Sequence, residues 1–518
     1  FPADVMALRD GVPRPVARAV QKVLARTPID RFHTAAETIA ALREVDAPAP
    51  VRATAPPQSI AVLPFDNLSA DKENEYFGDG IAEEIISALA GIDGLQVAAR
   101  TSAFSFKGRH DDLRVIGEKL NVATVLEGSV RKAGNRLRIT VQLIAVADGY
   151  HLWSERYDRE LVDVFAVQDE IASAIAAKLQ VTFDRPAKAE RGPATPKQVE
   201  AYEAYIKGRV AMSRRVMMPE AARSFERVIA LEPHNAKAHA SLAETFRLLA
   251  NFGIVSPTEA IPRAKASIAR ALELDPRLAE AMSTAAVVAI AFDNDPERAI
   301  TLWERTLELD PKLAEARVMY AQYGLLFHRN DERRAVAEAR RAVDDDPRSG
   351  IVLALAAQTL GMAGRLHDAR RLALEAAEID DQSTLTNATA TLVLAEAGEG
   401  DDALRFAQRT LSLSGRATLG LAVCAVAESV CGNPHRADAY HRELCVRAEL
   451  DAVMFASLTM TATAAGRADE AMEYALRSVD AHELLSGSLL RWKSFAPLRA
   501  HPRFAELVAR ARGTPSTG

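Results

Sequence analysis

The chain has 518 residues, which is enough for several domains, because single domains usually have roughly 100–200 residues. Lys and Arg total 64 against 70 Asp and Glu, and the resulting net charge of −6 disfavours a general nucleic-acid-coating protein. Apolar residues make up 48% and charged residues 26%, as in globular proteins, and three cysteines are too few for a disulfide framework. We therefore expect a multidomain globular protein from a reducing compartment.

Residues 1–45 are predicted to form two short helices. The first ends before Pro28, because the residue before proline resists helix. The second begins at Thr34, where Glu37 completes a capping pattern. Because this segment has too little apolar area to hold a core alone, it should belong to a larger domain. Residues 46–58 follow as a Pro/Ala linker of extended character.

An α/β pattern occupies residues 59–183. Short apolar runs predict strands at 60–63, 95–99, 122–130 and 137–146, and amphipathic spacing predicts helices at 81–89, 115–120 and 162–179. The sequence Lys132-Ala-Gly-Asn135 is typical of a hairpin turn between the last two strands. The order β-α-β-α-β-β-α predicts one mixed sheet with helices packed against it. A second linker is expected at residues 184–197.

Charged residues in this domain leave two interpretations open. The basic residues that flank the hairpin turn, and a second group of aromatic and basic residues, could form a phosphate-binding patch or a ligand rim. The two groups are Arg131, Lys132, Arg136 and Arg138, and Phe104, Phe106, Lys107 and Arg109. A solvated hairpin tip, and core phenylalanines with surface charges, are the simpler interpretations. We expect no nucleic-acid partner.

Residues 198–485 are predicted to be a repeat array. Eight alanines are spaced by 43, 35, 36, 34, 34, 34 and 34 residues: Ala221, Ala264, Ala299, Ala335, Ala369, Ala403, Ala437 and Ala471. A proline follows the first four alanines by twelve residues, and a glycine precedes the last four by five. A period of 34 residues, with a small residue where two helices cross, indicates about eight tetratricopeptide repeats. The 43-residue step predicts an insertion of about nine residues around Phe252–Pro262.

Such a solenoid predicts a concave groove that binds an extended peptide or a helix and needs no catalytic residues. The sequence contains no phosphate-binding loop, dinucleotide fingerprint, zinc-protease motif, nucleophile elbow or kinase catalytic motif. Cys431, His435, His441 and Cys445 have spacings that could suit zinc, although filling of interhelical space is the simpler interpretation. We therefore expect no catalytic residue, metal or cofactor in this chain.

No run of 18 or more uncharged apolar residues is present, so a membrane span is not expected. The nearest candidate, Gly350–Gly364, contains Gln358 and Thr359 and is better interpreted as a buried helix. The amino terminus has no secretory signal pattern. It begins with Phe1 rather than Met, which suggests a piece of a longer gene product. These features predict a cytoplasmic protein.

Residues 12–45 resemble the carboxy-terminal end of a bacterial serine/threonine protein kinase domain. The family phrase Pro-x-x-Arg-Phe is present as Pro28, Arg31 and Phe32, followed by the predicted helix. In that family the arginine pairs with a buried glutamate, so the resemblance implies a structural role for Arg31. It also implies that the nucleotide site, with its ATP and Mg²⁺, would lie in a kinase domain upstream of Phe1.

Residues 59–180 resemble the TolB amino-terminal-like domain, which bacteria place between a signalling domain and tetratricopeptide repeats. The matching phrases are Ser59–Phe65, Glu75–Gly80, Arg100–Gly108, Val125–Arg131 and His151–Asp158. The resemblance implies no assigned activity. In this architecture the first domain is a kinase, an adenylate cyclase or a winged-helix DNA-binding domain, and residues 12–45 favour the kinase.

The repeats look like tetratricopeptide repeats, and Phe495–Phe504 resembles the usual closing segment of such proteins, so residues 486–518 should form a capping helix and tail. The sequence thus predicts the non-catalytic, protein-binding part of a bacterial serine/threonine kinase, acting in signal transduction. Two alternatives are open: the sensory half of a transcription regulator or adenylate cyclase, and a free-standing assembly scaffold. The partner and the oligomeric state are not readable from the sequence.

Overall fold

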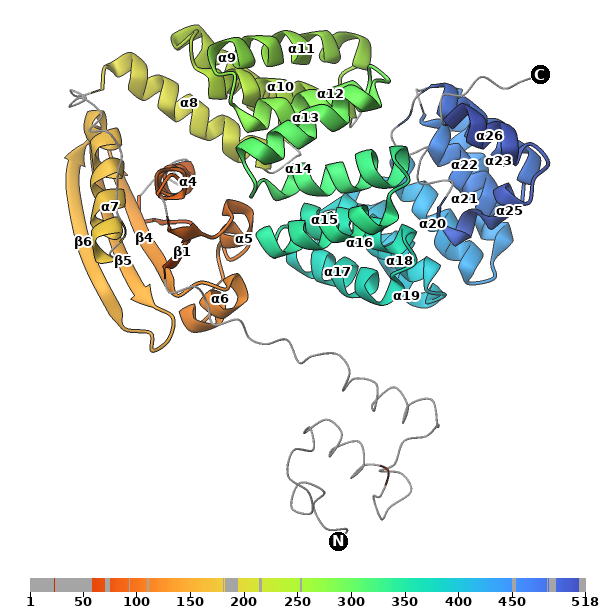
Figure 1. Cartoon of the computed structure of the whole chain (residues 1–518), viewed down its shortest axis with the longest axis horizontal. Helices are drawn as coiled ribbons and strands as arrows, with labels where there is room; N and C mark the ends of the chain where they lie inside the picture. The colour runs from red at the N-terminus through yellow and green to blue at the C-terminus, as the bar shows by residue number, and fades with distance from the viewer. Residues whose placement is uncertain are drawn as a thin grey trace. The chain divides into compact units, whose positions relative to one another are not determined.

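The computed structural model of the chain, shown in Figure 1, describes Val23 and residues 58–511, apart from short gaps. The gaps are 70–74, 93, 110, 180, 182–193, 214–216, 252–253, 450–452, 482 and 484–490. The predicted helices of residues 1–45, with Arg31, lie outside the described residues. The chain divides into two units, Phe1–Pro57 and Gln58–Gly518, and the description below concerns the second.

A mixed β-sheet forms the first part of this unit. Its strands are β1 (Ser59–Val62), β2 (Asp66–Asn67), β3 (Gln96–Val97), β4 (Thr124–Ala133), β5 (Arg136–Ala145) and β6 (His151–Glu160). The order is β3-β1-β4-β5-β6, with β2 paired to β4. Pairings among β1 to β4 are parallel, whereas β4-β5-β6 form an antiparallel meander. The predicted hairpin turn joins β4 to β5, with Gly134 at a φ of +59°.

Helices cover both faces of the parallel part of the sheet. Because side chains alternate along a strand, Ile60 and Val62 join a core with α4 (Glu75–Ala90) and α7 (Val164–Lys178). Ala61 and Leu63 point to the opposite face. There they pack in a smaller cluster with residues of α6 (Leu113–Leu120) and with Phe106, which follows α5 (Arg100–Phe104).

Strand β6 was not among the strands predicted from the sequence. Its residues have few apolar side chains, and of its ten residues only Tyr157 is buried. The strand lies at the edge of the sheet, so one side of its backbone and most of its side chains face solvent. Such a strand lacks the apolar alternation that reveals strands in a sequence.

The second part is a solenoid of helix pairs. The described pairs are α8 (Pro196–Ser213) with α9 (Met218–Leu231), α10 (Ala236–Asn251) with α11 (Pro257–Leu274), α12 (Ala279–Ala291) with α13 (Pro296–Leu309), α14 (Ala314–Met319) and its continuation η4 (Tyr320–His328) with α15 (Glu332–Asp345), α16 (Gly350–Met362) with α17 (Leu366–Ile379), α18 (Thr384–Glu396) with α19 (Gly400–Leu413), α20 (Thr418–Val430) with α21 (Pro434–Ala448), and α22 (Phe455–Ala464) with α23 (Ala468–Asp480). The predicted fold class, a small mixed-sheet domain followed by a solenoid of tetratricopeptide helix pairs, is confirmed.

Each of the eight regularly spaced alanines lies on the second helix of a pair and has an exposed fraction of 0%. Seven of them are the fourth residue of that helix, where a small side chain lets the paired helices approach closely. Ala264 is the eighth residue of α11, which has 18 residues against 14 in α13. The extra length of the second repeat is therefore taken up partly as an additional turn of α11, not as loop alone.

The turns within the pairs also follow the sequence pattern. Gly364, Gly398, Gly432 and Gly466 have φ values between +74° and +81°, which favour glycine. In two earlier repeats the same place is taken by Asn294 and Asn330, also with positive φ, because asparagine tolerates this conformation. The membrane candidate of the sequence is α16, a helix buried within the solenoid. Over the described ranges, no helix has the length and apolar character needed to cross a bilayer.

Candidate functional site

Three of the phrases that carry the family resemblance meet around Phe65. A Cβ atom at Gly78 would lie 2.2 Å from the carbonyl oxygen of Phe65, and a Cβ atom at Gly128 would lie 3.0 Å from its ring. Both glycines are therefore required for close packing of β4, α4 and the segment after β1. The three phrases thus pack against one another in the core, and this packing explains the residue types found in them.

Charged residues of two family phrases, Glu75–Gly80 and Arg100–Gly108, form an acidic and basic cluster at the start of α4. Lys107 Nζ lies 2.6 Å from Asp79 Oδ2 and 2.8 Å from Glu75 Oε1. Asp79 is only 6% exposed, and its other carboxylate oxygen is buried without a hydrogen-bond partner among the described residues. Burial raises the pKa of Asp79, and the bond from Lys107 offsets only part of this effect.

One turn further along α4, Glu83 binds two arginines. Its carboxylate lies 2.8 Å from Arg100 Nε and 2.5 Å from Arg209 Nη2. Burial alone would raise the pKa of Glu83, but the charges of Arg209 and Arg100 outweigh it and lower that pKa. Because Arg209 belongs to α8, this ion pair joins the sheet domain to the first solenoid helix. Gly80 permits the contact, since a Cβ there would lie 2.3 Å from Ile206 of α8.

A second contact joins the sheet domain to the turn between α15 and α16. The Ser102 hydroxyl donates to Asp346 Oδ1 at 2.5 Å, and the Thr101 hydroxyl donates to the other oxygen. The backbone N–H of Arg348 donates to Ser102 Oγ at 2.8 Å, and its guanidinium lies 4.8 Å from the ring centre of Phe106. Burial raises the pKa of Asp346, and the two hydroxyls offset this in part. We call these two contacts, at Glu83 and at Asp346, the domain junction.

From α14 to α22 the first helices of successive pairs pack against one another in a row. Most of their side chains are buried, as in α16, where ten of 13 residues are buried. Polar groups within the row bond to one another: Gln322 Nε2 donates to Gln358 at 3.1 Å, and Gln358 Nε2 donates to Thr389 Oγ1 at 2.7 Å. Gln322 Oε1 is buried without a hydrogen-bond partner among the described residues. The row is therefore a packed interior over these repeats.

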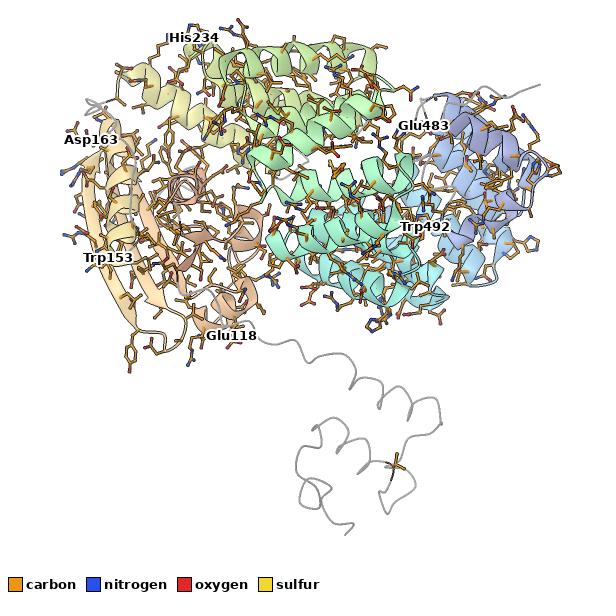
Figure 2. All side chains as sticks on the ribbon, in the orientation of Figure 1. Glu118, Trp153, Asp163, His234, Glu483 and Trp492 are labelled. Atoms are coloured by element: carbon orange, nitrogen blue, oxygen red, sulfur yellow. The ribbon has the colours of Figure 1, made fainter. Side chains whose placement is uncertain are left out.

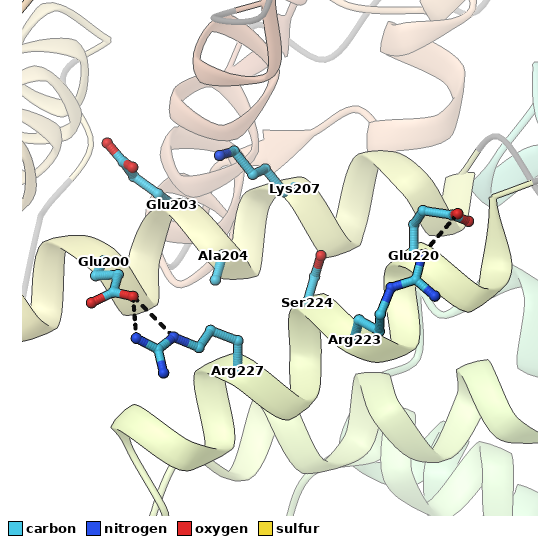
Figure 3. Close-up of a pocket in the computed structure, with 8 residues that line it drawn as sticks. All are labelled: Glu200, Glu203, Ala204, Lys207, Glu220, Arg223, Ser224 and Arg227. Atoms are coloured by element: carbon cyan, nitrogen blue, oxygen red, sulfur yellow. Dashed lines mark hydrogen bonds and ion pairs between the residues drawn. The ribbon is translucent and has the colours of Figure 1, made fainter.

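A shallow hollow of about 400 Å³ lies between α8 and α9 (Figure 3). It is lined by Glu200, Glu203, Ala204, Lys207, Glu220, Arg223, Ser224 and Arg227. Its charged residues already have partners; for example, Arg227 Nε lies 2.9 Å from Glu200 Oε1. The hollow is thus a surface depression lined mainly by charged side chains that pair with one another or with nearby groups.

The structure brings together only two of the four candidate zinc ligands. On α21, Cys445 Sγ lies 3.5 Å from His441 Nε2, and this nitrogen also lies 3.1 Å from Glu470 Oε2. Cys431 instead ends α20 and packs against the second-helix start of the preceding pair, and His435 is exposed. Within the described part of the chain, no three His, Cys, Asp or Glu side chains are placed to hold a metal.

The basic hairpin is not a free cationic patch. Lys132 Nζ lies 2.7 Å from Glu203 of α8 and 4.3 Å from the ring centre of Phe77. Arg138 Nε lies 2.6 Å from Asp158 on the neighbouring strand. Two of the four basic residues are therefore neutralised by nearby carboxylates, and Lys132 is a further link between the sheet domain and α8.

Comparisons with known proteins divide along the same two parts. A family model described as "HilA/YgeH-like transcriptional regulator, second domain" matches residues 57–174, which contain the sheet domain. A protein of Rhizobium meliloti (strain 1021), named "Putative adenylate cyclase 3", is 45% identical over 206 residues, covering 38% of this chain and 35% of that protein. The chain thus spans about a third of the length of this curated relative. The resemblance to the TolB family remains a prediction.

Solved structures with partial similarity include two helical-repeat proteins. The PilF protein of Pseudomonas aeruginosa has a TM-score of 0.32 and 18% identity, covering 40% of this chain and 90% of PilF. YrrB, described as a TPR protein with an unusual peptide-binding site, has a TM-score of 0.26 and 19% identity, covering 39% and 97%.

The residues of the domain junction were not singled out as a site in the sequence. Ser102 lies within a matched phrase, but Asp346 is 244 residues away and follows two other aspartates in an ordinary repeat turn. Glu83 is one of several acidic residues on an amphipathic helix. Pairing over such distances has no signature in a single sequence, so only the tertiary structure reveals it.

Proposed function

We propose that this chain is the sensory and protein-binding part of a signalling protein, in which the solenoid recruits a partner and the sheet domain communicates with an output domain. The second-domain match to transcriptional regulators and the adenylate cyclase name of the relative support an output of one of those two kinds. In this proposal the partner is a protein or peptide, and the protein acts in the cytoplasm.

The domain junction is the observation that carries this proposal. Glu83 joins α4 to α8. Asp346 joins α5 to the turn between the fourth and fifth pairs, 244 residues further along the chain. A solenoid serving only as a tether would need neither contact. Because interfaces of this kind are packed and not continuously deformable, movement of the solenoid on binding would be transmitted to the sheet domain.

A second candidate is the regulatory part of a serine/threonine kinase. The observation that favours it is the phrase formed by Pro28, Arg31 and Phe32, which lies outside the described residues. In this case ATP and Mg²⁺ would bind the parent's kinase domain. The present chain, incubated with ATP and a general protein substrate, is then expected to show no phosphate transfer, and measurable transfer would contradict this.

The test uses the full gene product, with cyclic AMP formation, phosphate transfer and DNA binding measured in parallel. Asp346→Ala is expected to change one of these outputs while the far-ultraviolet circular dichroism spectrum stays the same. The matched control is Asp310→Ala, at the equivalent position after α13. Among the described residues, the Asp310 side chain bonds within its own turn, where it accepts the N–H of Lys312. Equal outputs from both variants would refute communication through the junction.

A further inference from the structure

Near its carboxy terminus the chain contacts helix pairs that lie well before the last one. Helix α26 (Phe504–Ala511) packs on α23, where Arg503 Nη1 lies 3.0 Å from Glu473 and Arg510 Nη1 lies 2.6 Å from Asp480. Residues 491–499, which contain η5 (Lys493–Phe495) and α25 (Ala496–Arg499), contact α22 and α23 of the last pair and also reach the fourth, fifth and sixth pairs. We call these residues the C-terminal segment.

The first contact of the C-terminal segment is at the end of the π-helix η4. Arg491 Nη2 donates to the carbonyl oxygen of Leu326 at 2.6 Å and to Asn330 Oδ1 at 2.5 Å. The last turn of a helix leaves carbonyl groups without partners and carries partial negative charge, so a guanidinium is favourable there. The end of η4 is thus a site for a cationic side chain.

The second contact is a cap supplied by another helix. Glu396, the last residue of α18, accepts the backbone N–H groups of Lys493 at 2.7 Å and Ser494 at 3.2 Å. These N–H groups begin the short helix η5, and a carboxylate at a helix start is favourable for the same electrostatic reason as above. The contact requires a helical backbone but no particular side chain at these two positions.

Three apolar side chains complete the contact. Trp492, Phe495 and Leu498 are 3%, 2% and 1% exposed, and they belong to the same core as the solenoid helices. A Cβ atom at Gly361 of α16 would lie 2.7 Å from the indole of Trp492, so glycine makes the space that the ring fills. Figure 2 labels Trp492 where the teal and blue helix pairs meet. Trp492 precedes η5 in an extended conformation, and Phe495 and Leu498 follow it at intervals of three residues in η5 and α25.

We propose that this surface, made by the end of η4, Gly361 and Glu396 together with α22 and α23, is the peptide-binding site of the solenoid. Its ligand class is a short peptide of the pattern Arg-Trp-x-x-Phe-x-x-Leu, extended at the tryptophan and helical after it, and the C-terminal segment is its resident occupant. The proposal rests on the protein-recruiting role of the solenoid proposed above. A tethered occupant acts at an effective concentration of about the millimolar range, so a partner must compete with it.

The test measures binding of a fluorescent synthetic peptide of residues 491–499 to the full chain by anisotropy. In the variant Trp492→Ala/Phe495→Ala, the resident segment loses two anchors while the added peptide keeps them. This variant is expected to bind the peptide about tenfold or more tightly than the wild type does, because the tethered competitor is weakened. A peptide with alanine in place of tryptophan should lose this binding.

Two further variants make the result specific. Adding Gly361→Leu to the double variant should abolish peptide binding, since leucine fills the space for the indole. Lys493→Ala, which changes an exposed side chain of the segment, should leave the wild-type affinity unchanged. If the double variant loses its helical circular dichroism signal, Arg491→Ala serves instead, because it weakens the resident segment and not the added peptide.

A folded variant that binds this peptide no more tightly than a scrambled peptide would overturn the proposal. That outcome would leave the proposed signalling function standing, because the latter is tested by the output of the Asp346→Ala variant. Conversely, peptide binding with unchanged output from Asp346→Ala would refute communication through the domain junction and leave the peptide site intact.

Discussion

The sheet domain and the solenoid are stabilised in different ways. The sheet domain depends on contacts between residues far apart in the sequence, such as the half-buried carboxylate of Glu83 between Arg100 and Arg209. The solenoid repeats one small-residue contact, and its ion pairs mostly join neighbouring pairs at the surface, as in Arg370–Glu399 and Arg416–Glu443. The free energy of unfolding of the solenoid is therefore close to a sum of contributions from adjacent helix pairs. The stability of the sheet domain depends instead on a few individual side chains.

The largest effect is expected from removal of a half-buried charge in the sheet domain. Glu83→Ala leaves Arg100 and Arg209 without their counter-ion and should lower the free energy of unfolding by about 3 kcal/mol, the lower end of the range for buried ion pairs. Urea denaturation, followed by hydrogen exchange of β1 and β4, measures this. Glu170→Ala is the control, because Glu170 pairs with Arg159 at the surface and its loss should matter little. Similar losses of unfolding free energy in Glu83→Ala and Glu170→Ala would contradict the view that the sheet domain depends on a few individual side chains.

A smaller effect is expected at a helix crossing of the solenoid. Ala335→Leu places three extra carbon atoms where the exposed fraction is 0%, and should cost about 1–3 kcal/mol by overpacking. The same substitution at Ala468, the exposed first residue of α23, should leave the thermal midpoint nearly unchanged. Equal midpoints for the two variants would show that the regularly spaced alanines are not crossing positions.

Removing one hydroxyl group of the domain junction should have a similar effect. Ser102→Ala removes both the donor to Asp346 and the acceptor of the Arg348 N–H, and it should cost about 1–3 kcal/mol, because the buried carboxylate keeps Thr101 as a donor. Hydrogen exchange should increase both in α5 and in the turn between α15 and α16. Ser173→Ala is the control, since that hydroxyl bonds within α7. An increase in hydrogen exchange that is confined to α5 would show that α5 and the turn between α15 and α16 are not coupled.

The finest test uses two carboxylates one turn apart on α4 whose pKa values shift in opposite directions. The pKa of Glu83 is lowered from 4.5, so its contribution to stability is present above 4.5 and is lost as the pH falls through the lowered value. The pKa of Asp79 is raised from 3.8, so its contribution is present below 3.8 and is lost as the pH rises through the raised value.

As the pH falls from about 7 to about 3, the wild type should therefore lose stability relative to Glu83→Gln and gain stability relative to Asp79→Asn. Urea midpoints of the three proteins over this range measure both differences. Because each comparison subtracts the titration of all other groups, parallel pH profiles would show that these two carboxylates do not differ in environment.

Much of the fold could be predicted because the relevant signals are local. The crossing alanines and the turn glycines and prolines report backbone geometry within one repeat, and the hairpin before Asn135 is specified by its own turn residues. Strand β6 could not be predicted, since an edge strand with exposed charged side chains needs no apolar alternation. Where a peptide could bind on the solenoid could not be predicted either, because the first helices are largely buried, as α16 is, and their packing depends on the tertiary structure.

The sequence alone determined a mixed-sheet domain followed by helix pairs of about 34 residues, because periodicity and turn chemistry act between near neighbours. Only the tertiary structure decided which distant groups meet: Glu83 with Arg209, Ser102 with Asp346, and Arg491 with the end of η4. These contacts join residues more than 120 positions apart, and their chemistry depends on burial that no local pattern encodes.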